Sequence, residues 1–195
     1  MSTGLAMPLE RADRIVSRFI ELFGPYCERI AVAGSVRRRK AKIGDIDMLA
    51  IPKATRDLLG QTFGDELADA LNEAVAKGTI AKGDQWGDRK KKIILLDGTA
   101  IDLVSCEEDN WGSWLLIRTG PAEFNKAIVT NRGKGGLLPD GWRFGESFRL
   151  FDADGNKLPT RDEREVFAAL GLEWIEPERR RIPMPSTTGG KVVEC

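Results

Sequence analysis

The chain contains no histidine among its 195 residues. It therefore has neither a Ser–His or Cys–His nucleophile pair nor a histidine ligand for a metal. Any chemistry must come from carboxylates, lysines, arginines, hydroxyl groups or bound metal ions. Cysteine is scarce as well: Cys27, Cys106 and Cys195 are odd in number and far apart. They fit no disulfide framework, which favours a reducing compartment.

Long apolar runs are also absent. No stretch is long enough to span a membrane, and the N-terminus lacks the apolar core of a secretory signal. We therefore expect a cytoplasmic protein with no membrane partner. Lysine plus arginine (30) equals aspartate plus glutamate (30), so the chain as a whole has no net charge that would attract nucleic acid. Apolar residues make up 42% of the chain, enough for the core of one large domain or two small ones.

The spacing of apolar residues predicts both helices and strands. Helices are predicted over residues 10–23, from Phe63 to the residue before Gly78, over residues 111–117 and 121–131, and between Thr160 and Gly171. Strands are predicted over residues 29–33, 45–51, 91–96 and 99–105, and the hairpin dipeptide Asp97-Gly98 joins the last two. Thr160 and Glu163 have the spacing of a capping box for the last helix.

Two segments carry groups that can bind phosphate or metal. Gly34-Ser35 follows a predicted strand, and Arg38 comes three residues after Ser35. A glycine lets the backbone approach a phosphate, while a hydroxyl and a guanidinium can bind its oxygens. Asp45 and Asp47 alternate with apolar residues, so in a strand both carboxylates would share one face. The alternatives are a plain connecting turn for the first segment and two solvated carboxylates for the second.

Asp102 adds a third carboxylate within an alternating strand at residues 100–104. If this strand pairs near the one that carries Asp47, the three carboxylates converge. Three carboxylates can hold two metal ions roughly 4 Å apart, an arrangement that supports phosphoryl transfer without histidine. Mg²⁺ is the expected ion because it prefers oxygen ligands, and Mn²⁺ could substitute.

The string GSVRRRKAKIGDIDMLAIP, residues 34–52, resembles the nucleotidyltransferase motif of family X DNA polymerases, the DNA polymerase beta group. Asp102 in the string AIDLV corresponds to the third aspartate of that family. Thr119-Gly120 and Asn125 are similar to its nucleotide-pocket turn, and residues 158–180 resemble the end of bacterial-type members. The resemblance runs from about residue 11 to residue 181. It implies an α+β fold. Residues 1–108 would be a nucleotidyltransferase palm, a mixed sheet with flanking helices, followed by a small, mostly helical thumb at residues 109–182 and a flexible tail at residues 183–195.

The resemblance also implies roles for individual residues. Asp45, Asp47 and Asp102 would be the catalytic and metal-binding residues for two Mg²⁺ ions, and Asp102 would take the proton of the primer 3′-hydroxyl. The residues implied in nucleotide binding are Gly34, Ser35, Arg38 and Gly44, followed by Ile117, Arg118, Thr119, Gly120 and Asn125. Basic residues are interpreted as DNA contacts, although a charged run is usually a solvated surface: Arg37, Arg39, Lys40, Lys42, Arg89, Lys90, Lys91, Lys92 and Lys126.

The chain departs from the family in two places. Ile117-Arg118 stand where the family usually has an aromatic pair that senses the sugar, and Val129 stands where some members have an arginine. The residues before Gly34 are also too few for the family's amino-terminal lyase domain. The expected function is a monomeric, template-directed DNA polymerase that adds dNTPs to primer-template or gapped DNA, as in short-gap filling during DNA repair. The alternatives are a nucleotidyltransferase with a non-DNA acceptor and an inactive DNA-binding module.

Overall fold

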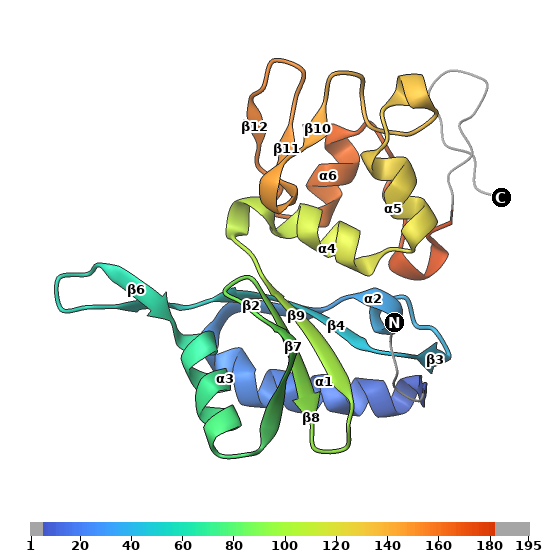
Figure 1. Cartoon of the computed structure of the whole chain (residues 1–195). Coiled ribbons are helices and arrows are strands. Elements are labelled where there is room, and N and C mark those ends of the chain that lie inside the picture. The colour runs from blue at the N-terminus through green and yellow to red at the C-terminus, as the bar shows by residue number, and fades with distance from the viewer. Residues whose placement is uncertain (1–5, 182–195) are drawn as a thin grey trace. The chain divides into compact units, whose positions relative to one another are not determined.

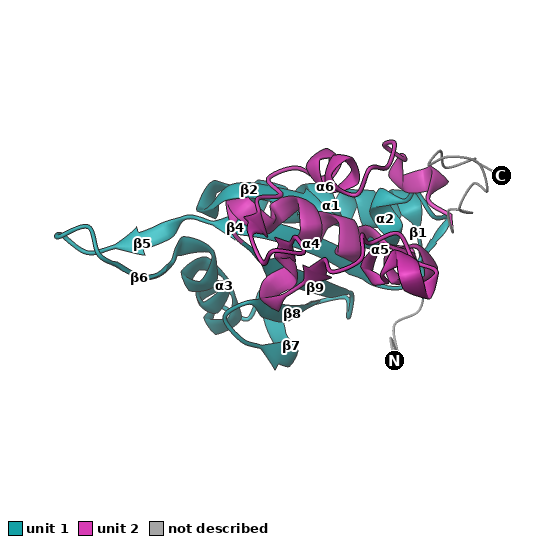
Figure 2. Ribbon diagram, turned by 90° about the horizontal axis from the view of Figure 1, so that it is seen from above, with its two compact units in different colours: residues 1–106 teal, residues 107–195 magenta. Residues whose placement is uncertain are grey.

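The structure, a computed structural model, describes residues 6–181. The chain divides into two compact units, residues 1–106 and residues 107–195 (Figure 2). This division falls two residues before the boundary predicted at Glu108. The tail predicted at residues 183–195 lies outside the described residues. Within the described part of the chain, no helix is long and apolar enough to cross a membrane.

The first unit is built on a five-stranded mixed sheet with the strand order β2-β4-β9-β8-β7 (Figure 1). Its strands are β2 (Cys27–Val32), β4 (Ile46–Pro52), β9 (Ala100–Ser105), β8 (Lys90–Leu95) and β7 (Ile80–Trp86). Strands β4 and β9 run parallel, and the other neighbouring strands are antiparallel. Two short pairings flank the sheet, β1 (Met7–Pro8) with β3 (Lys42–Ile43) and β5 (Ala54–Arg56) with β6 (Thr62–Asp65).

Two helices cover one face of this sheet (Figure 1). They are α1 (Leu9–Phe23) and α3 (Glu66–Ala76), and the shorter elements are η1 (Gly24–Tyr26) and α2 (Gly34–Arg37). On α1 the apolar residues recur at helical spacing, so Val16 and Phe19 are buried against the sheet. Ile46 and Met48 of β4 complete this core with no exposed surface. Since side chains alternate along a strand, Asp47 turns to the opposite face.

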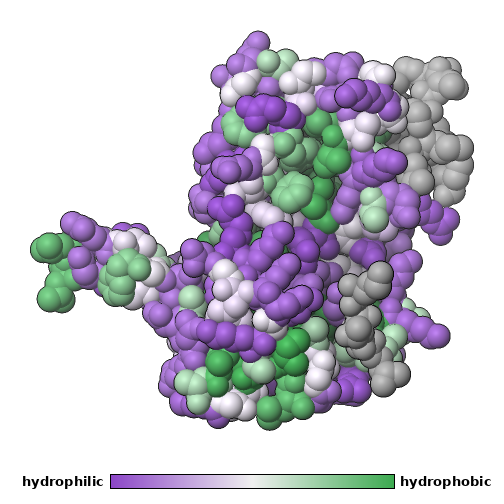
Figure 3. All heavy atoms as spheres, viewed as in Figure 1, coloured by the Kyte–Doolittle hydropathy of each residue, from purple (hydrophilic) through white to green (hydrophobic). Residues whose placement is uncertain are grey.

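The segment before α3 differs from its prediction. Phe63 is 70% exposed and lies on β6, and Leu58 and Leu59 are exposed as well. Hydrophobic (green) atoms are visible on the projecting β5–β6 hairpin (Figure 3). The helix begins instead at Glu66, because the Asp65 carboxylate accepts a hydrogen bond from the Ala68 N–H at 2.5 Å and caps it. Helical spacing of Phe63 with later apolar residues was therefore misleading.

The second unit packs helices α4 (Trp111–Thr119), α5 (Ala122–Val129) and α6 (Glu163–Ala169) beside a three-stranded antiparallel sheet. The strands are β10 (Arg143–Phe144), β11 (Leu150–Phe151) and β12 (Lys157–Leu158). Short 3₁₀ turns are η2 (Glu108–Asn110), η3 (Arg132–Lys134), η4 (Glu146–Phe148) and η5 (Pro177–Arg179). Leu116, Phe124 and Phe167 lie in its core. The predicted α+β architecture is confirmed: a mixed sheet with flanking helices, then a small unit built mainly on helices.

The cap of α6 differs from its prediction. Asp162, not Thr160, is the N-cap, and its carboxylate accepts from the Arg164 N–H at 2.8 Å. Glu165 completes the capping box by accepting from the Asp162 N–H at 3.3 Å. The Thr160 hydroxyl shares a hydrogen bond of 2.8 Å with the Ser113 hydroxyl of α4. Thr160 therefore joins two helices of the unit instead of starting one.

Candidate active site

Strands β4 and β9 bring two of the predicted site carboxylates side by side. Their parallel register pairs Asp47 with Asp102, on neighbouring strands that lie roughly 4.8 Å apart. Ile46 and Ile101, one residue before each aspartate, are fully buried on the helix-covered face. Both aspartates are half-buried and turn to the other face of the sheet. The two strands that carry Asp47 and Asp102 are therefore neighbours, which was the condition set for their carboxylates to converge.

Gly34 provides the space in which the Asp47 carboxylate lies. A Cβ atom at residue 34 would overlap that carboxylate, and the backbone of Gly34 has φ +59°. The chain is held here because the Ala33 N–H donates to the Asp47 carbonyl at 2.8 Å. Both the close approach and the left-handed conformation therefore require glycine at this position.

Asp45 is placed differently from the other two carboxylates. It lies in the bend before β4, so the ladder between β4 and β9 does not fix its side chain. The strand predicted to begin at Asp45 begins at Ile46. Within residues 6–181, no three His, Cys, Asp or Glu side chains are gathered around a common metal position.

The residues present nevertheless fit a divalent cation. Mg²⁺ is usually held by one or two carboxylates together with phosphate oxygens of a substrate, and seldom by a cage made of protein alone. Asp47 and Asp102 supply two such carboxylates on one face, and Asp45 is two residues from Asp47. Their oxygens are hard donors, so the donor set suits Mg²⁺ or Mn²⁺.

Lys92 is a neighbour of Asp102 that sequence analysis assigned only to DNA. It is paired with Asp102 across β8 and β9, and its Nζ lies 3.8 Å from Oδ1 of Asp102 and 3.6 Å from Oδ1 of Asp84. Gly83 on β7 makes this path possible, because a Cβ atom there would lie 2.6 Å from Cγ of Lys92. The Lys92 ammonium therefore lies between the carboxylates of Asp84 and Asp102, and the aliphatic part of the Lys92 side chain passes over Gly83. The glycine in β7 was the signal that could have predicted this contact.

The remaining residues of the predicted phosphate motif follow β2 closely. α2 is a single turn in which the Arg38 N–H donates to the Gly34 carbonyl at 3.2 Å. Arg38 therefore lies one helical turn beyond Gly34. Ser35 and Gly44 are half-buried, and Gly44 lies in the bend that also carries Asp45.

The first basic run contains half-buried and exposed residues. Arg39 donates to Asp13 of α1 at 2.8 Å, so this guanidinium joins the loop after α2 to α1. Lys40 and Lys42 are exposed, and Arg37 is half-buried.

The second run needs one correction. Arg89 and Lys90 are exposed, whereas Lys91 retains only 6% of its surface and donates to the Gly87 and Asp88 carbonyls, both at 3.0 Å. Lys91 has its side chain on the helix-covered face of β8, so its ammonium turns back to the β7–β8 connection. This corrects the interpretation of Lys91 as a DNA contact.

The predicted sugar and base residues lie in the second unit, where α4 ends and α5 begins. Thr119 is the last residue of α4 and is fully buried, and Gly120 has φ +73°. Nδ2 of Asn125 donates to the Ile117 carbonyl at 2.6 Å, which ties α5 to the last turn of α4. Among the described residues, Oδ1 of Asn125 is buried without a hydrogen-bond donor. Arg118 is half-buried.

Lys126, predicted to contact DNA, is exposed on α5.

Comparison with known proteins finds a match in the second unit. Residues 114–181 match the family described as DNA polymerase beta thumb. The chain is similar to that thumb family in this segment. It is similar to DNA polymerase lambda of Rattus norvegicus, with 26% identity over 189 residues, which covers 89% of this chain and 33% of the relative. The chain thus spans about a third of the length of that relative. As labels only, residues 1–106 are called the palm and residues 107–181 the thumb, after the parts that the resemblance implies.

Proposed function

We propose that the chain is a template-directed DNA polymerase that joins a dNTP to the 3′-hydroxyl of a primer. The observation that carries the proposal is the pairing of Asp47 with Asp102 on one face of a palm that is followed by a polymerase thumb. Gly34 and the turn that leads to Arg38 supply groups suited to a triphosphate. The similarity to DNA polymerase lambda supports the same assignment.

The reaction forms a bond between the primer 3′-oxygen and the α-phosphorus, and pyrophosphate leaves. Asp45, Asp47 and Asp102 would hold two Mg²⁺ ions, and Mn²⁺ could replace them. When bound, the ions would make the 3′-hydroxyl more acidic and neutralise charge on the phosphates. Asp102 would accept the proton of the 3′-hydroxyl through its carboxylate.

The other residues would orient the two substrates. Ser35 and Arg38 would bind phosphate oxygens, and Gly34 and Gly44 keep the adjoining backbone free of side chains. In the thumb, Thr119-Gly120 would line the sugar and Asn125 would reach the base. Exposed Lys40, Lys42, Arg89, Lys90 and Lys126 would contact phosphates of the primer and template.

Extension assays on matched DNA substrates test this function. The full chain is incubated with Mg²⁺ and dNTPs on primed, nicked and gapped DNA and on single strands. Short-gap filling by a monomer, as needed in DNA repair, predicts template-dependent extension that is greatest on short gaps. Transfer to an RNA end or to unpaired DNA, without dependence on the template base, would contradict a template-directed polymerase.

We expect Arg38→Ala to weaken dNTP binding much more than DNA binding. Charge-assisted hydrogen bonds to phosphate contribute about 1.5–3 kcal/mol, so the dNTP KM should rise roughly tenfold to a hundredfold. Steady-state incorporation and DNA binding by anisotropy measure the two effects separately. Arg39→Ala is the matched control, because Arg39 is directed to Asp13. A loss of DNA binding alone in Arg38→Ala would place Arg38 on the template side.

Lys92 would be a positioning residue for Asp102. Lys92→Met keeps the aliphatic stem over Gly83 but removes the charge, so we expect kcat to fall by up to about tenfold, or ~1.4 kcal/mol, with the dNTP KM nearly unchanged. Lys92→Arg should recover most of the rate. Pre-steady-state incorporation measures kcat and KM separately. A change confined to DNA affinity would show that Lys92 acts only on phosphates.

We expect this chain to incorporate ribonucleotides more readily than relatives that have an aromatic pair before Thr-Gly. Ile117 is smaller than an aromatic residue, and the Arg118 guanidinium can donate a hydrogen bond to a ribose 2′-hydroxyl. An apolar wall alone rejects an added hydroxyl only modestly. The ratio of dNTP to NTP incorporation efficiency should therefore be higher in Ile117→Tyr than in the wild type. A strong dNTP preference that Ile117→Tyr leaves unchanged would contradict this expectation.

A further inference from the structure

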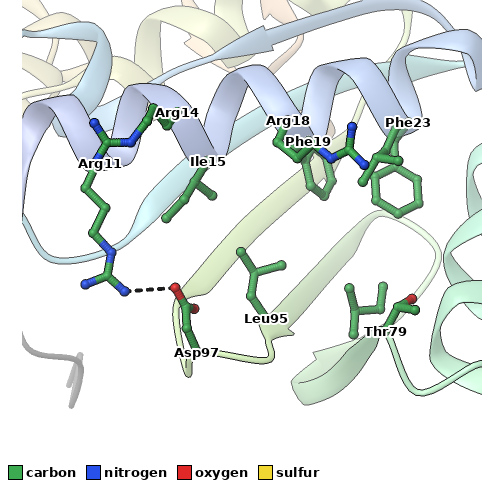
Figure 4. A pocket seen from close by; sticks show the side chains of 11 residues that line it. Arg11, Arg14, Ile15, Arg18, Phe19, Phe23, Thr79, Leu95 and Asp97 are labelled. Carbon is green, nitrogen blue, oxygen red and sulfur yellow. Dashed lines mark hydrogen bonds and ion pairs between the residues drawn. The ribbon is translucent and has the colours of Figure 1, made fainter.

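A groove in the palm lies between helix α1 and the strands β7 and β8 (Figure 4). It encloses about 310 Å³, within the size of sites that bind small ligands or the side chains of a peptide. Apolar side chains form most of its lining: Ile15, Phe19, Leu22 and Phe23 of α1, with Ile80 and Leu95. Leu22 is 48% exposed, so the apolar surface continues to the rim of the groove.

This groove is separate from the proposed active site. α1 packs on the face of the sheet that carries Ile46 and Met48, whereas Asp47 and Asp102 turn to the other face. A ligand in the groove therefore does not touch the carboxylates. Binding in the groove is therefore independent of the proposed polymerase activity.

Three arginines follow the groove along α1. Arg11, Arg14 and Arg18 all line it, and their spacing places them along roughly 10 Å of one side of the helix. Arg11 pairs with Asp97 at 2.8 Å, and Arg18 pairs with Glu21 at 2.6 Å. Both ion pairs are largely exposed to solvent, and such pairs contribute little to stability and exchange readily. Within residues 6–181, Arg14 makes no ion pair.

The lining therefore carries a positive charge. Asp97 is the one acidic residue among those that line the groove, against three arginines. Its pKa is lowered to about 2, first by the hydrogen bond from the Thr99 N–H and then by the Arg11 guanidinium. Asp97 thus stays ionised at neutral pH and offsets the charge of Arg11, and Glu21 offsets that of Arg18, so the charge of Arg14 remains.

The combination of apolar lining and spaced arginines selects among ligand classes. DNA would use the arginines but would leave the apolar lining uncovered, because its backbone is charged throughout. A single-headed lipid would fill the lining but engage only one guanidinium. A peptide with several carboxylates and apolar anchors satisfies both features over the length of the arginine row. We propose that this groove binds an acidic segment of a partner protein, with apolar side chains in the groove and carboxylates on Arg11, Arg14 and Arg18.

Selection from a displayed library of random peptides on the full chain tests the proposal. The enriched peptides should combine Asp or Glu with Leu, Phe or similar residues. The best one, labelled with fluorescein, is then titrated with the wild type and with Arg14→Glu/Arg18→Glu. We expect the charge reversal to weaken binding at least about tenfold, because each charge-assisted contact contributes more than that factor. Arg56→Glu, on the β5–β6 hairpin, is the matched control and should bind as the wild type does.

Three results would overturn the proposal. The first is that the wild type enriches no peptides beyond those enriched on the Arg14→Glu/Arg18→Glu variant. The second is that the enriched peptides are basic or uncharged. The third is displacement of the labelled peptide by lauric acid or an oligonucleotide more effectively than by unlabelled peptide, which would assign the groove to a lipid or to DNA. Circular dichroism on heating shows whether the same variants remain folded, and this control does not require polymerase activity.

Discussion

An Asp102→Asn variant is expected to fold as the wild type does and to lose nucleotide incorporation by at least about a hundredfold. The change removes a proposed metal ligand and the candidate base for the 3′-hydroxyl together, and a positioned base alone contributes 10² to 10⁴ in rate. Folding should persist because Asp102 is half-buried on the face opposite the helices and has no place in the palm core. Single-turnover extension of gapped DNA measures the rate, and circular dichroism on heating measures the fold.

Asp84→Asn is the matched control for this prediction. Asp84 faces the same lysine, with 3.6 Å between its Oδ1 and Nζ of Lys92, but its side chain is 77% exposed on β7. It should therefore retain incorporation close to the wild-type rate. Equal losses in the two variants would mean that the charge around Lys92 matters and that the specific place of Asp102 does not. Wild-type rates in a folded Asp102→Asn protein would contradict the proposed metal site.

The alternation of side chains along strands predicted much of the palm site from the sequence. Asp47 and Asp102 each lie between apolar residues, which indicates a carboxylate on the face away from the core. The pattern could not establish that β4 and β9 are neighbours in parallel, since a long crossover separates them in the chain. The pairing therefore remained a condition at that stage, because spacing within one strand carries no information on its neighbour.

Lys91 and Lys92 show where composition alone fails. The two adjacent lysines look equivalent in a basic run, yet one is buried beneath the sheet and the other lies beside Asp102. Alternation along β8 separates them, and the core residue Ile93, two positions after Lys91, indicates the buried face. A basic run within a strand should therefore be divided by face before its residues are assigned to DNA.

Helix starts were the other source of error, because local signals compete. Residues 160–163 and residues 162–165 both have capping-box spacing, and the structure uses the second. The Thr160 hydroxyl is taken by Ser113 of α4, a tertiary contact that sequence spacing cannot reveal. Phe63 similarly fits the apolar spacing of α3, but Asp65 caps the helix after it. In each case the N-cap is an aspartate followed by a glutamate, a sequence signal for the start of a helix.

Breaking the buried ion pair of the thumb is expected to have the largest effect on stability. Nη1 of Arg180 donates to Oε1 of Glu163 at 2.7 Å, and the two side chains are 0% and 2% exposed. The guanidinium also lies 5.3–5.7 Å from the rings of Phe124, Phe167 and Trp174. A buried charge that loses its partner retains its full cost of desolvation, so Glu163→Ala should lower the free energy of unfolding by about 3–5 kcal/mol.

A double variant separates the pair's charge from its packing. Glu163→Met/Arg180→Met removes both charges and keeps apolar volume, so it should be considerably more stable than Glu163→Ala, because apolar replacement of a buried pair is often nearly neutral. Glu73→Ala breaks an exposed pair with Lys77 on α3 and should change stability little. Urea unfolding followed by tryptophan fluorescence reports on the thumb, since Trp174 lies beside Arg180. If Glu163→Ala were no less stable than Glu73→Ala, or the double variant no more stable than Glu163→Ala, the thumb would not depend on neutralising Arg180. The same 2.7 Å contact joins the start of α6 to the chain after η5, so we expect its loss to release the C-terminal part of the thumb first.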